Sequence, residues 1–255
     1  MTRFVLIALA ASAFVLAGCQ TTRHEATMDD TMDEMGVSST EGESMQDEQS
    51  MMTTEFVVTI SVLANSPTPL APVAWAVHTG ANPFVTGEMG RLAGLESLAE
   101  DGNPAEAAAT LDGHDGVVLH GVANTPEGAT SAGPATPGSS YSFTVKAHEG
   151  ERLSFATMYV QSNDLFFSPG SDGIALFDMS TPVDGSITSR VYLYDAGTEV
   201  NEEPGSGPNQ PPRQSGPNTG SSEDKRVTRI GDAMDGFTYP DTNAVISVTV
   251  SPDMM

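Results

Sequence analysis

Residues 141–159 read YSFTVKAHEGERLSFATMY, and this stretch carries the clearest strand pattern in the chain. Apolar side chains recur at every second position in residues 141–145, and the pattern returns in residues 153–159. Successive side chains of a strand point to opposite faces, so this alternation is typical of a half-buried β-strand. The segment HEGE between the runs, residues 148–151, is short and contains a glycine. Two such runs joined in this way predict a β-hairpin.

The same period appears near the start of the domain, in residues 56–63. Phe56, Val58, Ile60 and Val62 alternate there with a second set of side chains that is also fairly apolar, so we expect both faces of this strand to lie inside the protein. Further strands are expected near residues 165–167, 173–176, 189–194, 227–230 and 244–250.

Helical signals are few. Residues 91–100 place leucines at three-residue spacing, and residues 104–111 open with a proline, which suits the first turn of a helix. Many strands separated by glycine and proline turns, with so little helix, predict a mainly β fold. We expect a single antiparallel β-sandwich with one or two short helices, extending over residues 55–252.

The beginning of the chain has the order of a secretory signal. A basic residue is followed by an apolar run over residues 4–15, and the sequence Leu-Ala-Gly-Cys then ends at Cys19. The run is shorter than the roughly 20 apolar residues that a membrane-spanning helix needs. We therefore predict a lipoprotein signal peptide over residues 1–18 and a lipid on Cys19, which anchors the mature protein to a membrane. The alternative is an ordinary signal peptide with an incidental cysteine.

Cys19 is also the one cysteine of the chain, so the sequence permits no disulfide within it. Gln20 follows the cysteine, and this resembles the outer-membrane sorting of Gram-negative lipoproteins. The predicted location is the bacterial cell envelope, as an outer-membrane lipoprotein facing the periplasm or the exterior.

Residues 19–54 combine the predicted lipidated cysteine with many acidic, small and polar residues. Such a composition buries too little apolar surface to fold, so we expect a disordered acidic tether. The whole chain carries a net charge of −24 with 34 acidic against 10 basic residues. This charge argues against nucleic acid and anionic membrane surfaces as partners, and a saline habitat would suit it because salt screens its self-repulsion.

Acidic residues gather after one predicted strand, in the sequence VYLYDAGTEVNEE of residues 191–203. Gly197 allows a sharp turn that would bring Asp195 and Glu199 to one side of a tight loop. Their charges repel one another, and a calcium ion, which accepts about six to eight oxygen ligands in flexible geometry, would remove the repulsion. Zinc fits poorly, because the loop has no histidine or thiolate. A solvated acidic turn is the alternative.

Two longer stretches, MYVQSNDLFFSPGSDGIALFD at 158–178 and VYLYDAGTEVNEEPGSGPNQPPRQ at 191–214, resemble the spondin domain of F-spondin and mindin. Residues 75–83 and 94–111 further resemble the bacterial lipoprotein branch of that family. The resemblance implies a β-sandwich related to calcium- and lipid-binding domains, with one calcium bound by Asp164, Asp195 and Glu199. Glu199 stands where the family has aspartate. The integrin-binding motifs and cysteines of animal members have no counterpart here.

A different function class is suggested by LDGHDGVVLHG, residues 111–121, which sets Asp112, His114, Asp115 and His120 close together. They could form the metal site of an envelope-associated hydrolase, or merely a polar turn before a short strand. The chain has no nucleophile elbow, phosphate-binding glycine loop or cysteine–histidine zinc pattern. We therefore predict a calcium-binding surface interaction or adhesion module without catalytic activity, whose partner is a surface protein or glycan.

Overall fold

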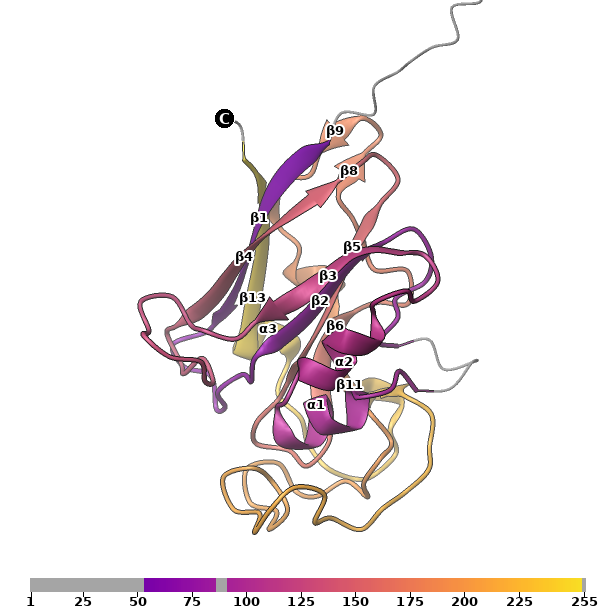
Figure 1. Ribbon diagram of the computed structural model, residues 1–255. Helices are drawn as coiled ribbons and strands as arrows, with labels where there is room; N and C mark the ends of the chain where they lie inside the picture. The colour runs from indigo at the N-terminus through magenta and orange to yellow at the C-terminus, as the bar shows by residue number, and fades with distance from the viewer. Residues whose placement is uncertain (1–52, 86–90, 254–255) are drawn as a thin grey trace, which may run out of the picture. The chain divides into compact units, whose positions relative to one another are not determined.

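The structure is a computed structural model that describes residues 53–85 and 91–253 (Figure 1). The predicted signal peptide and residues 19–52 of the predicted tether lie outside these residues. Strand β1 begins at Thr54, one residue before the expected start of the domain, and β13 ends at Pro252, the expected last residue. Within the described ranges, no helix has both the length and the apolar character needed to cross a bilayer.

The first sheet is antiparallel and contains the strand predicted near the start of the domain. Its strands run in the order β10 (Gly185–Ser186), β13 (Ile246–Pro252), β1 (Thr54–Val62) and β4 (Ser140–Ala147). Along β1, Phe56, Val58, Ile60 and Val62 are buried, whereas the residues between them are only half-buried. The expectation of two buried faces is therefore wrong, because only one face of this sheet packs against the core.

The second sheet packs on the buried face of the first. Its order is β12 (Thr228–Arg229), β11 (Val191–Asp195), β6 (Leu165–Pro169), β5 (Arg152–Met158), β2 (Val73–His78) and β3 (Val117–Ala123), with β7 (Ile174–Ala175) also paired to β5. These pairings are antiparallel, and β8 (Phe177–Asp178) and β9 (Thr181–Pro182) form a separate small ribbon. The predicted antiparallel β-sandwich is thus confirmed.

The predicted hairpin at residues 141–159 is wrong. Strands β4 and β5 form as expected, but β4 pairs with β1 in the first sheet, whereas β5 pairs with β2 and β6 in the second. The segment at residues 148–151 carries the chain from one sheet to the other. Both strands direct their apolar side chains into the same core, so the alternation is the same as in a hairpin.

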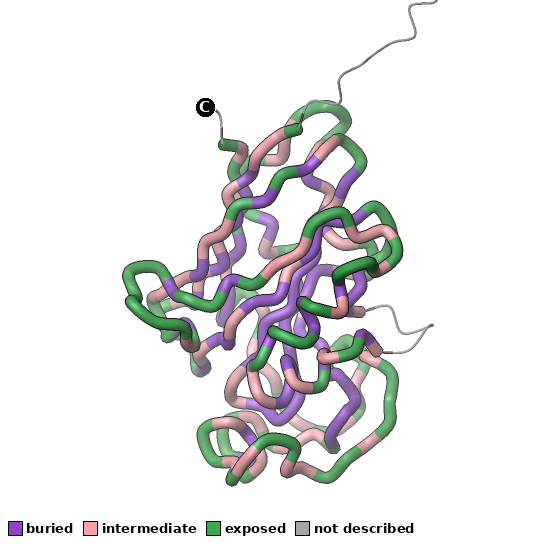
Figure 2. Tube along the Cα trace, viewed as in Figure 1, coloured by how far each residue is buried: buried purple, intermediate pink, exposed green. Residues whose placement is uncertain are grey.

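Two helices cover the outer face of the second sheet, α1 (Leu95–Asp101) and α2 (Ala105–Thr110). Leu95 and Leu98 of α1 pack with Ala76 and Phe166 of the sheet in a second apolar cluster. The structure therefore has a helical layer outside the sandwich, and Figure 2 shows the buried residues concentrated in the second sheet between the other two layers. The helix predicted at residues 91–100 begins later, because Gly94 adopts a left-handed φ of 81°.

Two elements could not be predicted from the hydrophobic periodicity of the sequence. Strand β2, with the sequence VAWAVH, is buried on both faces and so shows no clear alternation. The short helix α3 (Thr242–Val245) occupies the start of the strand expected at residues 244–250, and β13 begins only at Ile246.

Candidate metal centre

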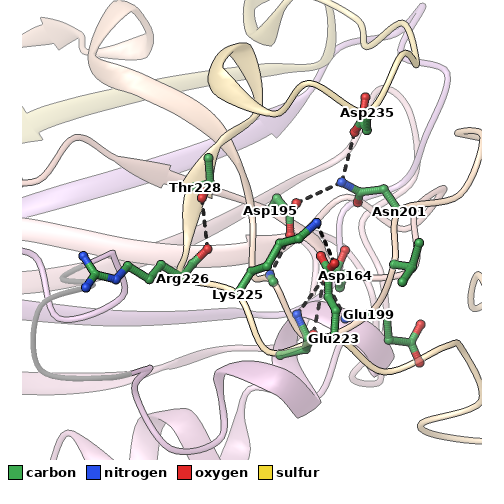
Figure 3. Close-up of polar contacts among 12 residues, drawn as sticks. Asp164, Asp195, Glu199, Asn201, Glu223, Lys225, Arg226, Thr228 and Asp235 are labelled. Atoms are coloured by element: carbon green, nitrogen blue, oxygen red, sulfur yellow. Dashed lines mark hydrogen bonds and ion pairs between the residues drawn. The ribbon is translucent and has the colours of Figure 1, made fainter.

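Asp164 and Asp195 lie side by side at one edge of the second sheet (Figure 3). Asp164 directly precedes β6 and Asp195 is the last residue of β11, and these two strands are antiparallel neighbours with Asp195 opposite Leu165. The backbone N–H of Ala196 donates to the carbonyl of Asp164 at 3.1 Å. Both aspartates are buried, with exposed fractions of 0% and 4%.

One oxygen of Asp164 is well satisfied and the other is not. Its Oδ2 accepts hydrogen bonds from the backbone N–H groups of Thr198 and Glu199, each at 3.1 Å, and from the hydroxyl of Thr198 at 3.4 Å. Its Oδ1 is buried without a hydrogen-bond partner. A buried carboxylate oxygen left unpaired destabilises a protein, so this atom is a candidate metal ligand.

The turn after β11 is built around Asp195 as the sequence predicts. The backbone N–H of Gly197 donates to Asp195 Oδ1 at 2.6 Å, and Asn201 Nδ2 donates to Oδ2 at 2.9 Å. Gly197 has a φ of 67°, and a Cβ atom there would lie 2.7 Å from the carbonyl oxygen of Lys225. Both the backbone angle and the close approach require glycine.

Burial is the main influence on the acidity of both aspartates. It raises the pKa of Asp164 well above its usual value, and the neighbouring charge of Asp195 raises it further, against the backbone hydrogen bonds from Glu199 and Thr198. Burial likewise raises the pKa of Asp195, as does the charge of Glu223, while hydrogen bonds from Gly197 and Asn201 oppose the shift. The site therefore favours a proton or a cation over two bare negative charges.

A third carboxylate, Glu223, joins the pair and was not predicted. Its side chain is 10% exposed, its Oε1 is buried without a partner, and its Oε2 lies 2.6 Å from Nζ of Lys225. The backbone N–H groups of Glu223 and Lys225 donate to the carbonyls of Thr198 and Gly197, which holds this segment against the turn. No periodic pattern in the sequence indicates this contact, because residues 196–227 form an irregular loop.

Arg91 fixes the turn from the other side. Its Nε donates to the carbonyl of Ala196 at 3.0 Å, and its Nη2 donates to the carbonyls of Gly197 and Lys225, each at 2.9 Å. These carbonyl oxygens are therefore already bound to the guanidinium group. The side-chain carboxylates are therefore the oxygens left to bind an ion.

The structure brings the carboxylates of Asp164 and Asp195 together but directs that of Glu199 elsewhere. Oε1 of Glu199 accepts from the backbone N–H of Gly220 at 2.6 Å, and Oε2 accepts from Asn163 Nδ2 at 3.3 Å. Burial raises the pKa of Glu199, against these two hydrogen bonds. Glu199 therefore contributes to the Asp164 site through its backbone N–H group.

The donor set suits a hard cation such as calcium, since it consists of carboxylate oxygens without thiolate or imidazole. Two of these oxygens, Asp164 Oδ1 and Glu223 Oε1, are buried and unpaired. In residues 53–85 and 91–253, however, no three His, Cys, Asp or Glu side chains already form a group that could hold a metal ion. The residues therefore fit calcium in chemistry, and binding would require the side chains to converge and Lys225 to move.

The segment proposed for a hydrolase forms turns before β3, as its alternative interpretation predicted. Asp112 is 89% exposed and its Oδ1 lies 3.8 Å from Nε2 of His120, whereas Nδ1 of His114 bonds the backbone carbonyl of Asp115 at 3.2 Å. These side chains thus make separate local contacts.

A serine–histidine pair occurs elsewhere, between β2 and β5. Nε2 of His78 lies 2.8 Å from Oγ of Ser154, and Nδ1 lies 3.0 Å from the carbonyl of Gly80. The carbonyl can only accept, so Nδ1 carries the proton and Nε2 accepts from the serine. Ser154 and His78 are 0% and 1% exposed, which closes this pair to a substrate in the described conformation.

Comparison with models of known protein families gives no match, and comparison with curated proteins gives none either.

Proposed function

We propose that this chain is a lipid-anchored protein of the bacterial cell envelope whose β-sandwich domain binds calcium and serves in surface interaction or adhesion. The Leu-Ala-Gly-Cys sequence ending at Cys19 supports the anchor. The resemblance to the spondin domain supports calcium binding and an interaction role. The observation that carries the calcium proposal is the burial of Asp164 beside Asp195, with Asp164 Oδ1 unpaired.

Asp164, Asp195 and Glu223 would hold the ion, with Glu223 in the place that the resemblance gives to Glu199. Bound calcium supplies positive charge that removes the repulsion among these carboxylates. The carboxylates come from two strand ends and from the loop at residues 196–227, so their shared ligand would fix this loop against the sheet. The fixed loop would then present a defined surface to a protein or glycan.

Calorimetry with calcium on the full-length protein in detergent tests the site. Calcium modules of extracellular proteins commonly have dissociation constants near 10⁻⁴ to 10⁻³ M, so we expect binding at millimolar concentration and its loss with chelator. An ion that binds only the folded state at a hundredfold excess over its dissociation constant stabilises it by about 2.7 kcal/mol. Asp195→Asn should remove most of the calcium-dependent rise in melting temperature.

Asp112→Asn is the control, because Asp112 is exposed and outside the site. It should leave the calcium response intact. An absence of binding at millimolar calcium, or equal responses from the two variants, would contradict the proposal. The interaction role is tested by retention of envelope components on the immobilised protein, which should depend on calcium and fail with Asp195→Asn.

A further inference from the structure

Strand β3 forms an open edge of the second sheet. It pairs with β2 on one side, and no strand in the described residues pairs with its other side. The backbone N–H and C=O groups along such an edge can form hydrogen bonds with a further strand. Val118 has no partner on β2, because the register shifts there, so residues 119–123 are the regular part of the edge.

The other outer strands of the two sheets have features that discourage further pairing. β10 and β12 are each two residues long, and β4 carries Lys146, whose side chain is 65% exposed. Short strands and lysine side chains commonly protect sheet edges from unwanted partners. β3 is seven residues long and contains neither lysine nor proline. Among the outer strands that the structure describes, β3 therefore offers a long edge without these features.

Apolar side chains are exposed along this edge. Val118, Leu119 and Val122 are 48%, 38% and 37% exposed, and they make up half of the six large apolar side chains that are exposed in the described residues. Trp75 of β2 lies beside Gly121, where an added Cβ atom would come 2.6 Å from the indole ring. Exposed apolar side chains gathered in one place are typical of an interaction surface.

A cavity of about 560 Å³ adjoins the end of the edge. Val122 and Asn124 line it on one side, and Met158 of β5 and Pro104 of the helical layer line it on the other. The backbone N–H of Gly133 donates to the carbonyl of Asn124 at 2.9 Å, so the edge is closed beyond that point. A strand added to β3 would therefore end at the cavity, which is large enough to take an apolar side chain.

The surroundings of β3 are acidic. Residues 92–145, which include α1, α2 and β3, contain no lysine or arginine. They contain seven acidic residues, which are Glu96, Glu100, Asp101, Glu106, Asp112, Asp115 and Glu127. Asp112 Oδ1 lies 3.8 Å from Nε2 of His120 on β3, and Asp101 lines the cavity. A second copy of this chain, or its own acidic residues 20–52, would add negative charge here, whereas a basic partner would be attracted.

We propose that the β3 edge binds an extended segment of another protein in which a basic residue is flanked on both sides by apolar residues. The segment forms backbone hydrogen bonds with residues 119–123. Its basic residue lies opposite His120, within reach of Asp112, and its apolar residues pack beside Leu119 and Val122 and enter the cavity. In strand addition of this kind, backbone pairing supplies affinity and the side-chain contacts supply specificity.

This surface includes none of the proposed calcium ligands. The inference therefore goes beyond the proposed calcium function and does not rest on it. Binding is measured in the presence of chelator, so a failure here is distinct from a failure of the calcium proposal.

The test uses a synthetic peptide, KLVKVLK, with blocked ends, and the full-length protein in detergent at physiological salt. The peptide is symmetric, so in either strand direction its central lysine can face His120 while a leucine faces Val122. Trp75 is the one tryptophan of the chain and lies beside the edge, so its fluorescence reports on binding. We expect a saturable change with a dissociation constant below about 1 mM, and slower amide hydrogen exchange within residues 117–123.

Two further peptides separate the contributions. KLPKPLK has the same charge but lacks the N–H groups that a strand needs, and ELVEVLE can form a strand but has the opposite charge. Each should bind at least tenfold more weakly than KLVKVLK. A basic peptide held by charge alone would instead bind equally well with its prolines.

The protein variants place the peptide on β3. Val122→Lys adds an edge lysine and should weaken binding at least fivefold. Val200→Lys is the matched control, because Val200 is 50% exposed and lies in the long loop, and it should leave binding unchanged. Should Val122→Lys lower the melting temperature, Val122→Thr takes its place, since it keeps the branched shape, and it should weaken binding about threefold.

The proposal is overturned if KLVKVLK does not bind up to about 1 mM, if KLPKPLK or ELVEVLE binds as well, or if the Val122 and Val200 variants behave alike. Protection from hydrogen exchange outside residues 117–123 alone would also overturn it. Sedimentation provides the last check. A dimer of the native protein that Val122→Lys dissociates would show that a second copy occupies the edge instead.

Discussion

Asp164 and Asp195 are 31 positions apart in the chain, yet they meet because β6 begins where its antiparallel neighbour β11 ends. The pairing of Asp195 with Leu165 places the two carboxylates at one edge of the sheet, and burial then makes their shared negative charge unfavourable. This relationship is a property of strand register. A change in the turn after β11 should therefore affect both the stability of the fold and any ion bound there.

Gly197→Ala tests the requirement for glycine in that turn. An added Cβ would meet the backbone of Lys225 at 2.7 Å, in addition to the strain of a left-handed φ. Gly205→Ala is a matched control, because Gly205 also has a positive φ but nothing within 4 Å of the added atom. We expect Gly205→Ala to cost about 1 kcal/mol of unfolding free energy, and Gly197→Ala to cost about 1–3 kcal/mol more.

Urea unfolding of both variants measures this difference. Calcium affinity should fall with Gly197→Ala and stay unchanged with Gly205→Ala. Equal losses of stability would mean that the turn and the Lys225 segment can separate without cost, which would contradict the close packing of Gly197 against the Lys225 backbone.

Lys225 and calcium should compete for the same carboxylates. The ammonium group lies 2.6 Å from Glu223, and its side chain is 67% exposed, so it can leave the site readily. We expect Lys225→Gln to strengthen calcium binding severalfold, because the variant no longer needs to displace a positive charge. Lys146→Gln is the control, since Lys146 is 65% exposed and pairs with Glu55 at 3.6 Å, far from the turn in sequence.

Calorimetric titration of calcium into the two lysine variants distinguishes these outcomes. Weaker binding by Lys225→Gln would show that the lysine supports the site rather than competing with the ion. Equal affinities would indicate that calcium binds elsewhere.

Part of this site follows from the sequence. The glycine turn and the approach of Asp195 are local features that residues 191–203 encode directly. The contributions of Glu223 and Arg91 could not be predicted in this way. Glu223 lies in an irregular loop, and Arg91 is about a hundred residues from the turn, so hydrophobic periodicity indicates neither contact. The orientation of Glu199 depends on Gly220 in that same loop.

The fold shows the same division between local and distant information. Alternation located β1, β4 and β5, because each directs one set of side chains into a shared core. It could not reveal that β4 and β5 belong to different sheets, since strands that face each other across a sandwich have the same pattern as strands paired in a hairpin. Strand β2 lacks the pattern because helices cover its second face.

The proposed anchor is tested by Cys19→Ala. Loss of the thiol removes the site of lipid attachment, so the variant should leave the membrane fraction or accumulate with its signal peptide uncleaved. Detergent phase partitioning and the mass of the mature amino terminus provide the measurements. Normal cleavage together with unchanged partitioning would contradict lipidation at Cys19.

The pH dependence of stability should contain a separate contribution from His78. Burial lowers the pKa of His78, and the charges of Arg152 and His114 act in the same direction, against the hydrogen bond to Gly80. In the unfolded chain, His78 takes up a proton near pH 6.5, whereas in the folded chain it does so only at lower pH. The stabilisation from neutral His78 is present above pH 6.5 and is lost as the pH falls from there through the folded-state pKa.

The buried carboxylates act in the opposite direction. The raised pKa values of Asp164, Asp195 and Glu100 mean that the folded state takes up their protons first, so acidification from pH 7 favours folding at these groups. The total change of stability with pH therefore contains two contributions of opposite sign, one from His78 and one from the buried carboxylates. A single substitution at the histidine separates them.

His78→Gln provides this separation, because the glutamine oxygen can accept from Ser154 at the position of Nε2 but cannot gain a proton. Between pH 7.5 and 5, the variant should lose less stability than the native protein. The slopes of unfolding free energy against pH should differ by up to the contribution of one bound proton. Urea unfolding at several pH values measures it. His120→Gln is the control, because His120 lies on the exposed β3 edge and pairs only loosely with Asp112. If both glutamine variants follow the native curve, then protonation of His78 does not oppose folding, and the charged imidazole must donate from Nε2 to Ser154 Oγ instead of accepting from it.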